Sequence, residues 1–202
     1  MRLGILGSAK GAGAELVLDA VELLAGDLSV DRVIYLGEDA AVEDAAWAHA
    51  KHLGDPESLA TAFLDRAAEL AVCGDPPALE ELLEVDLELQ HLAEVRRVPK
   101  APNRAIELLE GSIVLFVADK ATLSEEDIAN AHVIIYGHAK EMAHARFGTR
   151  SFFTPGELAG RRVGVLEVEG DGRIVLSAYA LSGEPVLREL VAGHTTKITV
   201  SG

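Results

Sequence analysis

Short apolar runs alternate with longer segments of helical periodicity along the first half of the chain. Residues 3–6 form an apolar run that ends at Gly7, and a loop of small residues follows it. Apolar side chains then recur at helical spacing over about 13–24, and a second apolar run at 32–36 is closed by Gly37. This alternation predicts an α/β fold in which polar side chains gather where the strands end.

A helical insertion is predicted at about 40–70, followed by a leucine- and glutamate-rich helix at about 78–95. The insertion consists of two helices, at about 40–53 and 56–70, and carries Trp47, Phe63 and Leu64. We expect the insertion to pack onto the sheet. An interface with a partner is the alternative, because aromatic side chains anchor binding surfaces.

The second half of the chain has the turn signals and short apolar runs of β-structure. A hairpin turn is predicted at Glu110-Gly111 and another at 170–172, and a short helix begins after Ser124 with a partial capping-box pattern. The strands are predicted at 104–109, 112–117, 133–136, 143–148, 150–153, 161–169 and 173–181. Since no long linker divides the chain, residues 1–202 are predicted to form one domain.

The composition and charge of the chain exclude some classes of partner and of protein. The chain has 202 residues, 49% of them hydrophobic, and a formal charge of −15. That charge argues against nucleic acid or anionic lipid as a partner. No apolar run reaches the length of a membrane span, and we expect no signal peptide. The single cysteine, Cys73, ends a short apolar run and is expected to be buried. A chain with one cysteine has no internal disulfide, which is typical of the reducing cytoplasm.

Polar side chains follow five of the apolar runs. Because strand ends share one edge of an α/β sheet, we expect these side chains to converge on a site. In chain order they are Ser8 and Lys10, Glu38 and Asp39, Asp75, Asp119 and Lys120, and His138 and Lys140.

The order of these groups resembles the motifs of the calcineurin-like metallophosphoesterases, in their small single-domain phosphodiesterase branch. That family carries D-x-H, G-D, G-N, H-G, G-H-x-H and N-P-G-S in this order. The corresponding segments here are Ser8-Ala9-Lys10, Gly37-Glu38, Gly74-Asp75, Ala118-Asp119 or Asp119-Lys120, Gly137-His138-Ala139-Lys140 and Thr154-Pro155-Gly156-Glu157. The resemblance covers about residues 1–180. It implies a four-layer α/β/β/α sandwich, and it implies a homo-oligomer because many relatives self-associate.

The same resemblance predicts that one of the family's two metal positions is lost. Three of the four ligands of that metal would be Ser8, Lys10 and Lys140, and a lysine ammonium cannot ligate a metal. The second position would be formed by Glu38, Asp75, Asp119 and His138. These residue types can hold one Mn²⁺, Mg²⁺ or Zn²⁺ ion, and His138 would be the catalytic residue of an active enzyme.

Two further interpretations account for the lysines. Lys10, Lys140 and Lys120 would neutralise Glu38, Asp75 and Asp119 in a salt-bridge network that replaces the metals. In that case replacing Lys10 and Lys140 by methionine should destabilise the fold strongly. Alternatively, Ser8, Lys10 and Lys140 would form an anion-binding pocket with the amides of the glycine-rich loop.

The resulting hypothesis is a metallophosphoesterase-like protein that is non-catalytic, needs no cofactor and binds a partner protein or a small anionic ligand. The alternative is a divergent phosphoesterase or phosphodiesterase that uses a single divalent metal. A third class, a structural assembly subunit, would show obligate oligomerisation without a ligand pocket.

Overall fold

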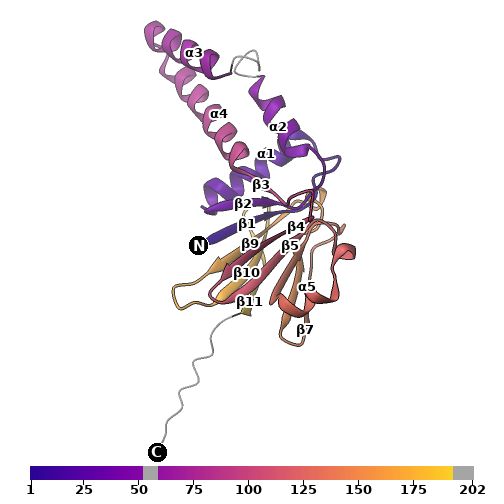
Figure 1. Cartoon of the computed structure of the whole chain (residues 1–202). Coiled ribbons are helices and arrows are strands. Elements are labelled where there is room, and N and C mark those ends of the chain that lie inside the picture. Colours follow the sequence, from indigo (N-terminus) through magenta and orange to yellow (C-terminus); the bar gives the residue numbers. More distant parts are fainter. Residues whose placement is uncertain (52–58, 193–202) are drawn as a thin grey trace, which may run out of the picture.

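The computed structural model describes residues 1–51 and 59–192, and the side chains of residues 59–62 are left undescribed. Two sheets lie face to face (Figure 1). The first has the strand order β11-β10-β9-β1-β2-β3 and the second has the order β4-β5-β6-β8-β7. The strands of the first sheet are β1 (Arg2–Leu6), β2 (Arg32–Tyr35), β3 (Arg96–Arg97), β9 (Arg162–Val168), β10 (Ile174–Ala180) and β11 (Pro185–Ala192). Those of the second are β4 (Arg104–Leu109), β5 (Ser112–Val117), β6 (Val133–Tyr136), β7 (Ala143–Phe147) and β8 (Arg150–Thr154).

The pairing of the strands confirms the α/β interpretation. Strand β1 is parallel to β2, and β2 is parallel to β3. In the second sheet β5, β6 and β8 are parallel to one another. The predicted hairpins β4–β5 and β9–β10 are both present, and β9 also runs antiparallel to β1. The C-terminal strands β9, β10 and β11 thus extend the first sheet from the side of β1.

Three apolar layers hold the sandwich together. The layer between the sheets includes Leu3, Ile5, Phe116, Ile135 and Phe153, each fully buried. A second layer lies between the first sheet and its helices, and a third between the second sheet and helix α5 (Glu125–Asn130). With helices on both outer faces, the chain has the four-layer α/β/β/α architecture that was predicted.

Four helices lie on the same side of the sandwich as the first sheet. They are α1 (Ala14–Glu22), which continues into a π-helical turn (Leu23–Asp27), α2 (Ala41–Ala50), α3 (Leu59–Cys73) and α4 (Pro76–Glu94). Helix α4 packs against α1 and α2, and α3 packs against α4. None of the described helices is long and apolar enough to cross a membrane.

Helices α3 and α4 form a hairpin, the helical arm, that projects away from both sheets (Figure 1). The expectation that the whole insertion packs onto the sheet is therefore wrong for α3. Part of the insertion, residues 52–58, lies outside the described residues.

The apolar run at residues 70–73 is the last turn of α3, and Cys73 is exposed. The prediction of a buried Cys73 is therefore wrong. The run continues the helical spacing of Phe63, Ala67 and Leu70, of which Leu70 is buried. Four consecutive apolar residues cannot by themselves distinguish a strand from a helix.

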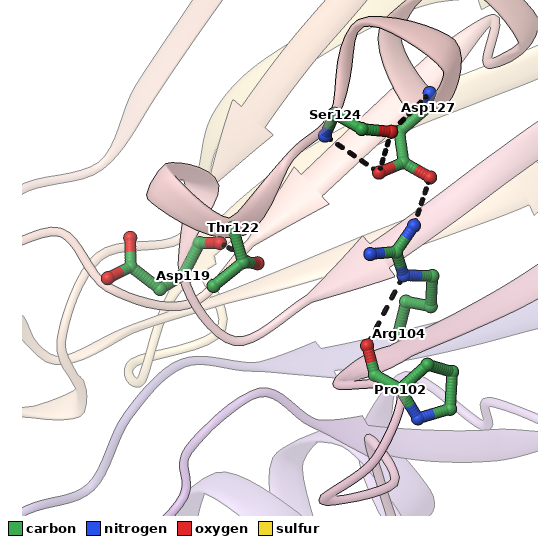
Figure 2. Close-up of polar contacts among 6 residues, drawn as sticks. All are labelled: Pro102, Arg104, Asp119, Thr122, Ser124 and Asp127. Atoms are coloured by element: carbon green, nitrogen blue, oxygen red, sulfur yellow. Dashed lines mark hydrogen bonds and ion pairs between the residues drawn. The ribbon is translucent and has the colours of Figure 1, made fainter.

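Helix α5 begins with the predicted capping box, and the aspartate of this box also bonds to β4. Figure 2 shows Asp127 accepting hydrogen bonds from the backbone N–H of Ser124 (2.8 Å) and from its hydroxyl (2.7 Å). The Ser124 hydroxyl in turn accepts from the Asp127 N–H at 3.1 Å. Arg104 of β4 donates to the same carboxylate and to the Pro102 carbonyl. The aspartate, one methylene shorter than the usual glutamate, therefore completes the box.

Candidate functional site

The carboxyl ends of β2, β3 and β5 enclose a pocket of about 430 Å³, here called the strand-end pocket. This is the place where α/β folds usually bind ligands. Arg97 and Lys100 bring two cationic side chains to it, and Glu38 brings one carboxylate. The lining residues are Gly37, Glu38, Arg97, Val98, Pro99, Lys100, Asn103 and Ala118.

The two sheets approach each other closely beside this pocket. A side-chain carbon added at Gly137 would lie 2.6 Å from the backbone oxygen of Leu36. Gly137 follows β6 and Leu36 follows β2, so this contact joins the ends of two strands from different sheets. Glu38 and His138 are thereby brought to one edge of the sandwich.

A buried tyrosine occupies the loop region where the resemblance places the first metal. The Tyr35 hydroxyl, at the end of β2, donates to Asp39 Oδ1 at 2.5 Å and accepts from the Ala9 N–H at 3.0 Å. Asp39 also accepts from the Ala41 N–H (3.0 Å) and from the buried Ser8 hydroxyl (3.4 Å). We call these contacts the Tyr35–Asp39 network. Sequence reasoning missed Tyr35, although a tyrosine in an apolar strand four residues before an aspartate was a visible signal.

Protonation states in this network follow from burial and hydrogen bonding. Burial, reinforced by the hydrogen bond to Asp39, strongly raises the pKa of Tyr35, so its hydroxyl stays protonated and donates. Partial burial acts to raise the pKa of Asp39, but the hydrogen bonds from Tyr35 and Ala41 outweigh it and lower this pKa. Asp39 is therefore an ionised carboxylate whose charge is stabilised by neutral donors.

The lysines do not form the predicted salt-bridge network. Lys10, Lys120 and Lys140 are exposed, and within the described part of the chain none lies within ion-pair distance of a carboxylate. Lys120 lies instead over the Tyr136 ring, 5.3 Å from its centre. The hypothesis is wrong because these lysines do not reach the acids of that network, two of which have other donors. The Ala78 N–H donates to Asp75, and the Ala121 N–H donates to Asp119.

Replacing Lys10 and Lys140 by methionine is therefore expected to change the free energy of unfolding by no more than about 0.5 kcal/mol, as for ordinary surface positions. Urea titration of the double variant checks this. Lys100→Met, at another exposed lysine, is the matched control. A loss of several kcal/mol in the double variant alone would restore the salt-bridge hypothesis.

Asp75 lies far from the other predicted site residues. It follows a helix rather than a strand, and its carboxylate caps α4 by accepting from the Ala78 N–H at 3.2 Å. The turn that contains it is at the tip of the helical arm (Figure 1). Helix α4 has 19 residues, so about 28 Å of helix separates Asp75 from β3. The predicted four-residue metal site that includes Asp75 is therefore wrong.

Asp119 and His138 do meet, at the ends of β5 and β6. Asp119 Oδ2 lies 3.5 Å from His138 Nδ1, and both side chains are partly exposed. The other oxygen of Asp119 accepts from the Ala121 N–H at 2.9 Å, and its carbonyl accepts from the Thr122 hydroxyl (Figure 2). In the described segments, no three His, Cys, Asp or Glu residues are grouped so that they could hold a metal ion. Asp119 and His138 therefore lack a third ligand of these types.

The predicted anion pocket of Ser8, Lys10 and Lys140 also differs from the structure. Lys10 lines a hollow of about 290 Å³ between the glycine-rich loop and α2, together with Asp39 and Asp44. Those two carboxylates disfavour an anion there. The Ser8 hydroxyl is directed to Asp39, and Lys140 is not among the residues that line the hollow. Arg97 and Lys100, in contrast, line the larger strand-end pocket.

The donor set does not fit the two-metal centre of the metallophosphoesterases. By the resemblance, the first-metal positions hold Ser8, Lys10 and Lys140, and Asp75, predicted at the Gly-Asn motif, caps α4 at the tip of the helical arm. Strand β3 has only two residues and carries no apolar run, so no motif was predicted after it.

Comparison with protein-family models and with curated protein sequences finds no match. Solved structures do match over nearly the whole chain. Vacuolar protein sorting 29 from Cryptosporidium parvum is 13% identical with a TM-score of 0.53, and the match covers 94% of this chain and 95% of that one. A predicted phosphoesterase from Streptococcus pneumoniae is 13% identical with a TM-score of 0.51, covering 93% and 95%. A double mutant of Vps29 from Entamoeba histolytica is 14% identical with a TM-score of 0.51, covering 95% and 100%. This chain therefore has the calcineurin-like metallophosphoesterase fold that its motifs predicted.

Proposed function

We propose that this chain is a non-catalytic protein of the metallophosphoesterase fold that binds a small anionic ligand in its strand-end pocket. The observation that carries the proposal is the pairing of Arg97 and Lys100 in a ligand-sized pocket at the strand ends. A pocket of this size accommodates a small molecule such as a nucleotide.

Arg97 is held in place at the pocket wall. Its guanidinium donates to Glu43 at 2.7 Å and lies over the Tyr35 ring, 5.5 Å from the ring centre. The Tyr35–Asp39 network fixes the Tyr35 ring and thereby also positions the Arg97 side chain. Preorganised donors of this kind recognise phosphate well because little conformational entropy is lost on binding.

Glu38 restricts the ligand further. Its carboxylate shares the pocket with the two cations, so a simple polyanion would be repelled on one side. A ligand that combines one phosphate with hydroxyl groups fits better, since the hydroxyls can donate to Glu38. We therefore propose a phosphate monoester of a polyhydroxy compound, such as a nucleoside monophosphate.

Calorimetric titration with adenosine monophosphate tests this proposal. We expect saturable binding, and Lys100→Met should weaken it about tenfold because a charge-assisted contact is lost. Lys51→Met, at the end of α2 and outside the pocket, should leave the affinity unchanged. Equal affinities in all three proteins, or no binding at all, would contradict the proposed ligand site.

A metal-dependent phosphoesterase is the second candidate, and the contact between His138 and Asp119 favours it. Titration with Mn²⁺ and hydrolysis of bis-p-nitrophenyl phosphate distinguish the two candidates. Tight binding of one Mn²⁺ per chain, with hydrolysis that is lost in His138→Ala, would replace the non-catalytic proposal. The homo-oligomeric state and the cytoplasmic location stay predictions, and sedimentation velocity checks the first of them.

A further inference from the structure

The helical arm carries a large share of the negative charge of the protein. Residues 59–94 contain nine aspartates and glutamates but only one arginine. That cation, Arg66, donates to Glu69 at 3.3 Å on the exposed surface of α3. The arm therefore presents a strongly negative surface on a hairpin that projects away from both sheets (Figure 1).

Large apolar side chains are exposed on both helices of the arm. Leu83 and Leu87 of α4 are 52% and 50% exposed, and they lie one helical turn apart. Leu64 and Val72 of α3 are exposed still more. Together with the exposed Ala68 and Ala71, these side chains form what we call the arm face.

Helix geometry places these residues on one side of the hairpin. Leu70 and Leu82 are buried and mark the sides on which α3 and α4 face each other. At about 100° per residue, Leu64, Ala68 and Ala71 lie about 100–160° around α3 from Leu70, and Leu83 and Leu87 lie about 100–140° around α4 from Leu82. The two helices are antiparallel and face each other. Residues displaced by a similar angle, in the same sense, from Leu70 on α3 and from Leu82 on α4 therefore lie on the same side of the hairpin. The arm face is therefore continuous across both helices, with Val72 at its edge.

Carboxylates border this apolar strip. Glu80 and Glu84 each lie three residues before one of the exposed leucines, so they are neighbours of those leucines on the helix surface. Arg66 lies about 40° from Leu70 in the opposite sense, so it lies on the opposite side of α3 from the arm face. An apolar strip bordered by acids matches an amphipathic helix whose polar face is basic.

We propose that the arm face binds a basic amphipathic helix of a partner protein. A second copy of this chain fits poorly, because it would place a second acidic arm against the first and the whole chain carries a charge of −15. Nucleic acid and anionic membranes are disfavoured by the same charge. The proposal is independent of the ligand in the strand-end pocket.

The test uses a synthetic peptide of leucine and lysine in which the leucines recur at helical spacing, with a fluorescent label for anisotropy titration. We expect the full-length protein to bind this peptide, and a scrambled peptide of the same composition to bind at least about tenfold more weakly. Affinity should fall as salt is added, because opposite charges contribute to it.

Matched variants locate the binding surface. Leu83→Ser with Leu87→Ser should weaken binding at least about tenfold, since few apolar anchors contribute most of the affinity of such interfaces. Ile106→Ser with Leu108→Ser on β4 is the control, because these side chains are 61% and 70% exposed but lie on the second sheet. The control should bind the peptide like the unaltered protein.

Glu80→Gln with Glu84→Gln should weaken binding and also reduce its salt dependence, which a purely apolar contact would not show. Equal affinity for the helical and scrambled peptides, or equal affinity in the arm and β4 variants, would overturn the proposal. It would also be overturned if sedimentation showed that the leucine substitutions dissociate an oligomer, because the arm face would then bind a second copy. Thermal melting of each variant shows that it is folded.

Discussion

Gly7→Ala should prevent the protein from folding stably. A side-chain carbon at Gly7 would lie 1.9 Å from the backbone oxygen of Gly156, far inside the contact distance of the two atoms. Gly7 follows β1 in the first sheet, and Gly156 follows β8 in the second. Neither of these two backbone segments can move away easily. Gly156 has φ +83°, and a carbon added to it would itself lie 2.8 Å from the backbone of Glu141 and Met142.

We expect a loss of at least about 4 kcal/mol in the free energy of unfolding, which is a large fraction of the stability of a domain of this size. Circular dichroism during heating and urea titration measure it. Gly170→Ala is the matched control, because an added carbon there meets no atom within 4 Å. If Gly7→Ala unfolded at the same urea concentration as the control, the close approach of the two sheets at this point would be incorrect.

Tyr35→Phe should cost about 2–4 kcal/mol without creating a cavity. The substitution removes one hydroxyl, leaves the buried Ala9 N–H without its partner, and leaves Asp39 Oδ1 with the Ala41 N–H as its remaining donor. An unsatisfied buried donor costs about 1–3 kcal/mol, and the lost hydrogen bond to the charged carboxylate adds to this cost. Urea titration at neutral pH measures the loss. Tyr179→Phe is the control, since the Tyr179 hydroxyl makes none of the hydrogen bonds found among the described residues.

The effect of Tyr35→Phe should depend on pH with a definite sign. The pKa of Asp39 is lower in the folded protein than its ordinary value of 3.8, so its contribution to stability is complete above that value and is lost as the pH falls through the folded pKa. Removing the Tyr35 hydroxyl should raise the folded pKa and diminish this contribution. The stability difference between the two proteins should therefore be largest at neutral pH and shrink below about pH 3.8. A difference that stayed constant over this range would show that Asp39 is not stabilised by Tyr35.

The sequence predicted the elements whose signals are local. The apolar runs of β1, β2, β5 and β6 end in small or polar residues, and the hairpin turns have the residues that such turns require. The motif order then identified the fold. The prediction that the first metal position is lost rests on the residue types of Ser8, Lys10 and Lys140 alone.

The errors arose where a residue's role depends on distant parts of the chain. Cys73 ends an apolar run that is the last turn of a helix, and Asp75 follows that run; only the packing of α3 on α4 distinguishes this helix from a strand. The two-residue strand β3 carries no pattern of its own, so the pocket residues Arg97 and Lys100 were not among the predicted site residues.

The sequence by itself thus determined the order of most of the strands along the chain and the residue chemistry at their ends. The tertiary structure alone decided that Tyr35 meets Asp39 and Ala9, that Arg97 and Lys100 share a pocket, and that the arm leaves its apolar face uncovered. The physical reason is the range of the interactions. Periodicity and turn chemistry act between residues close in sequence, whereas hydrogen-bond partners and burial are set by strand register and helix packing between distant segments.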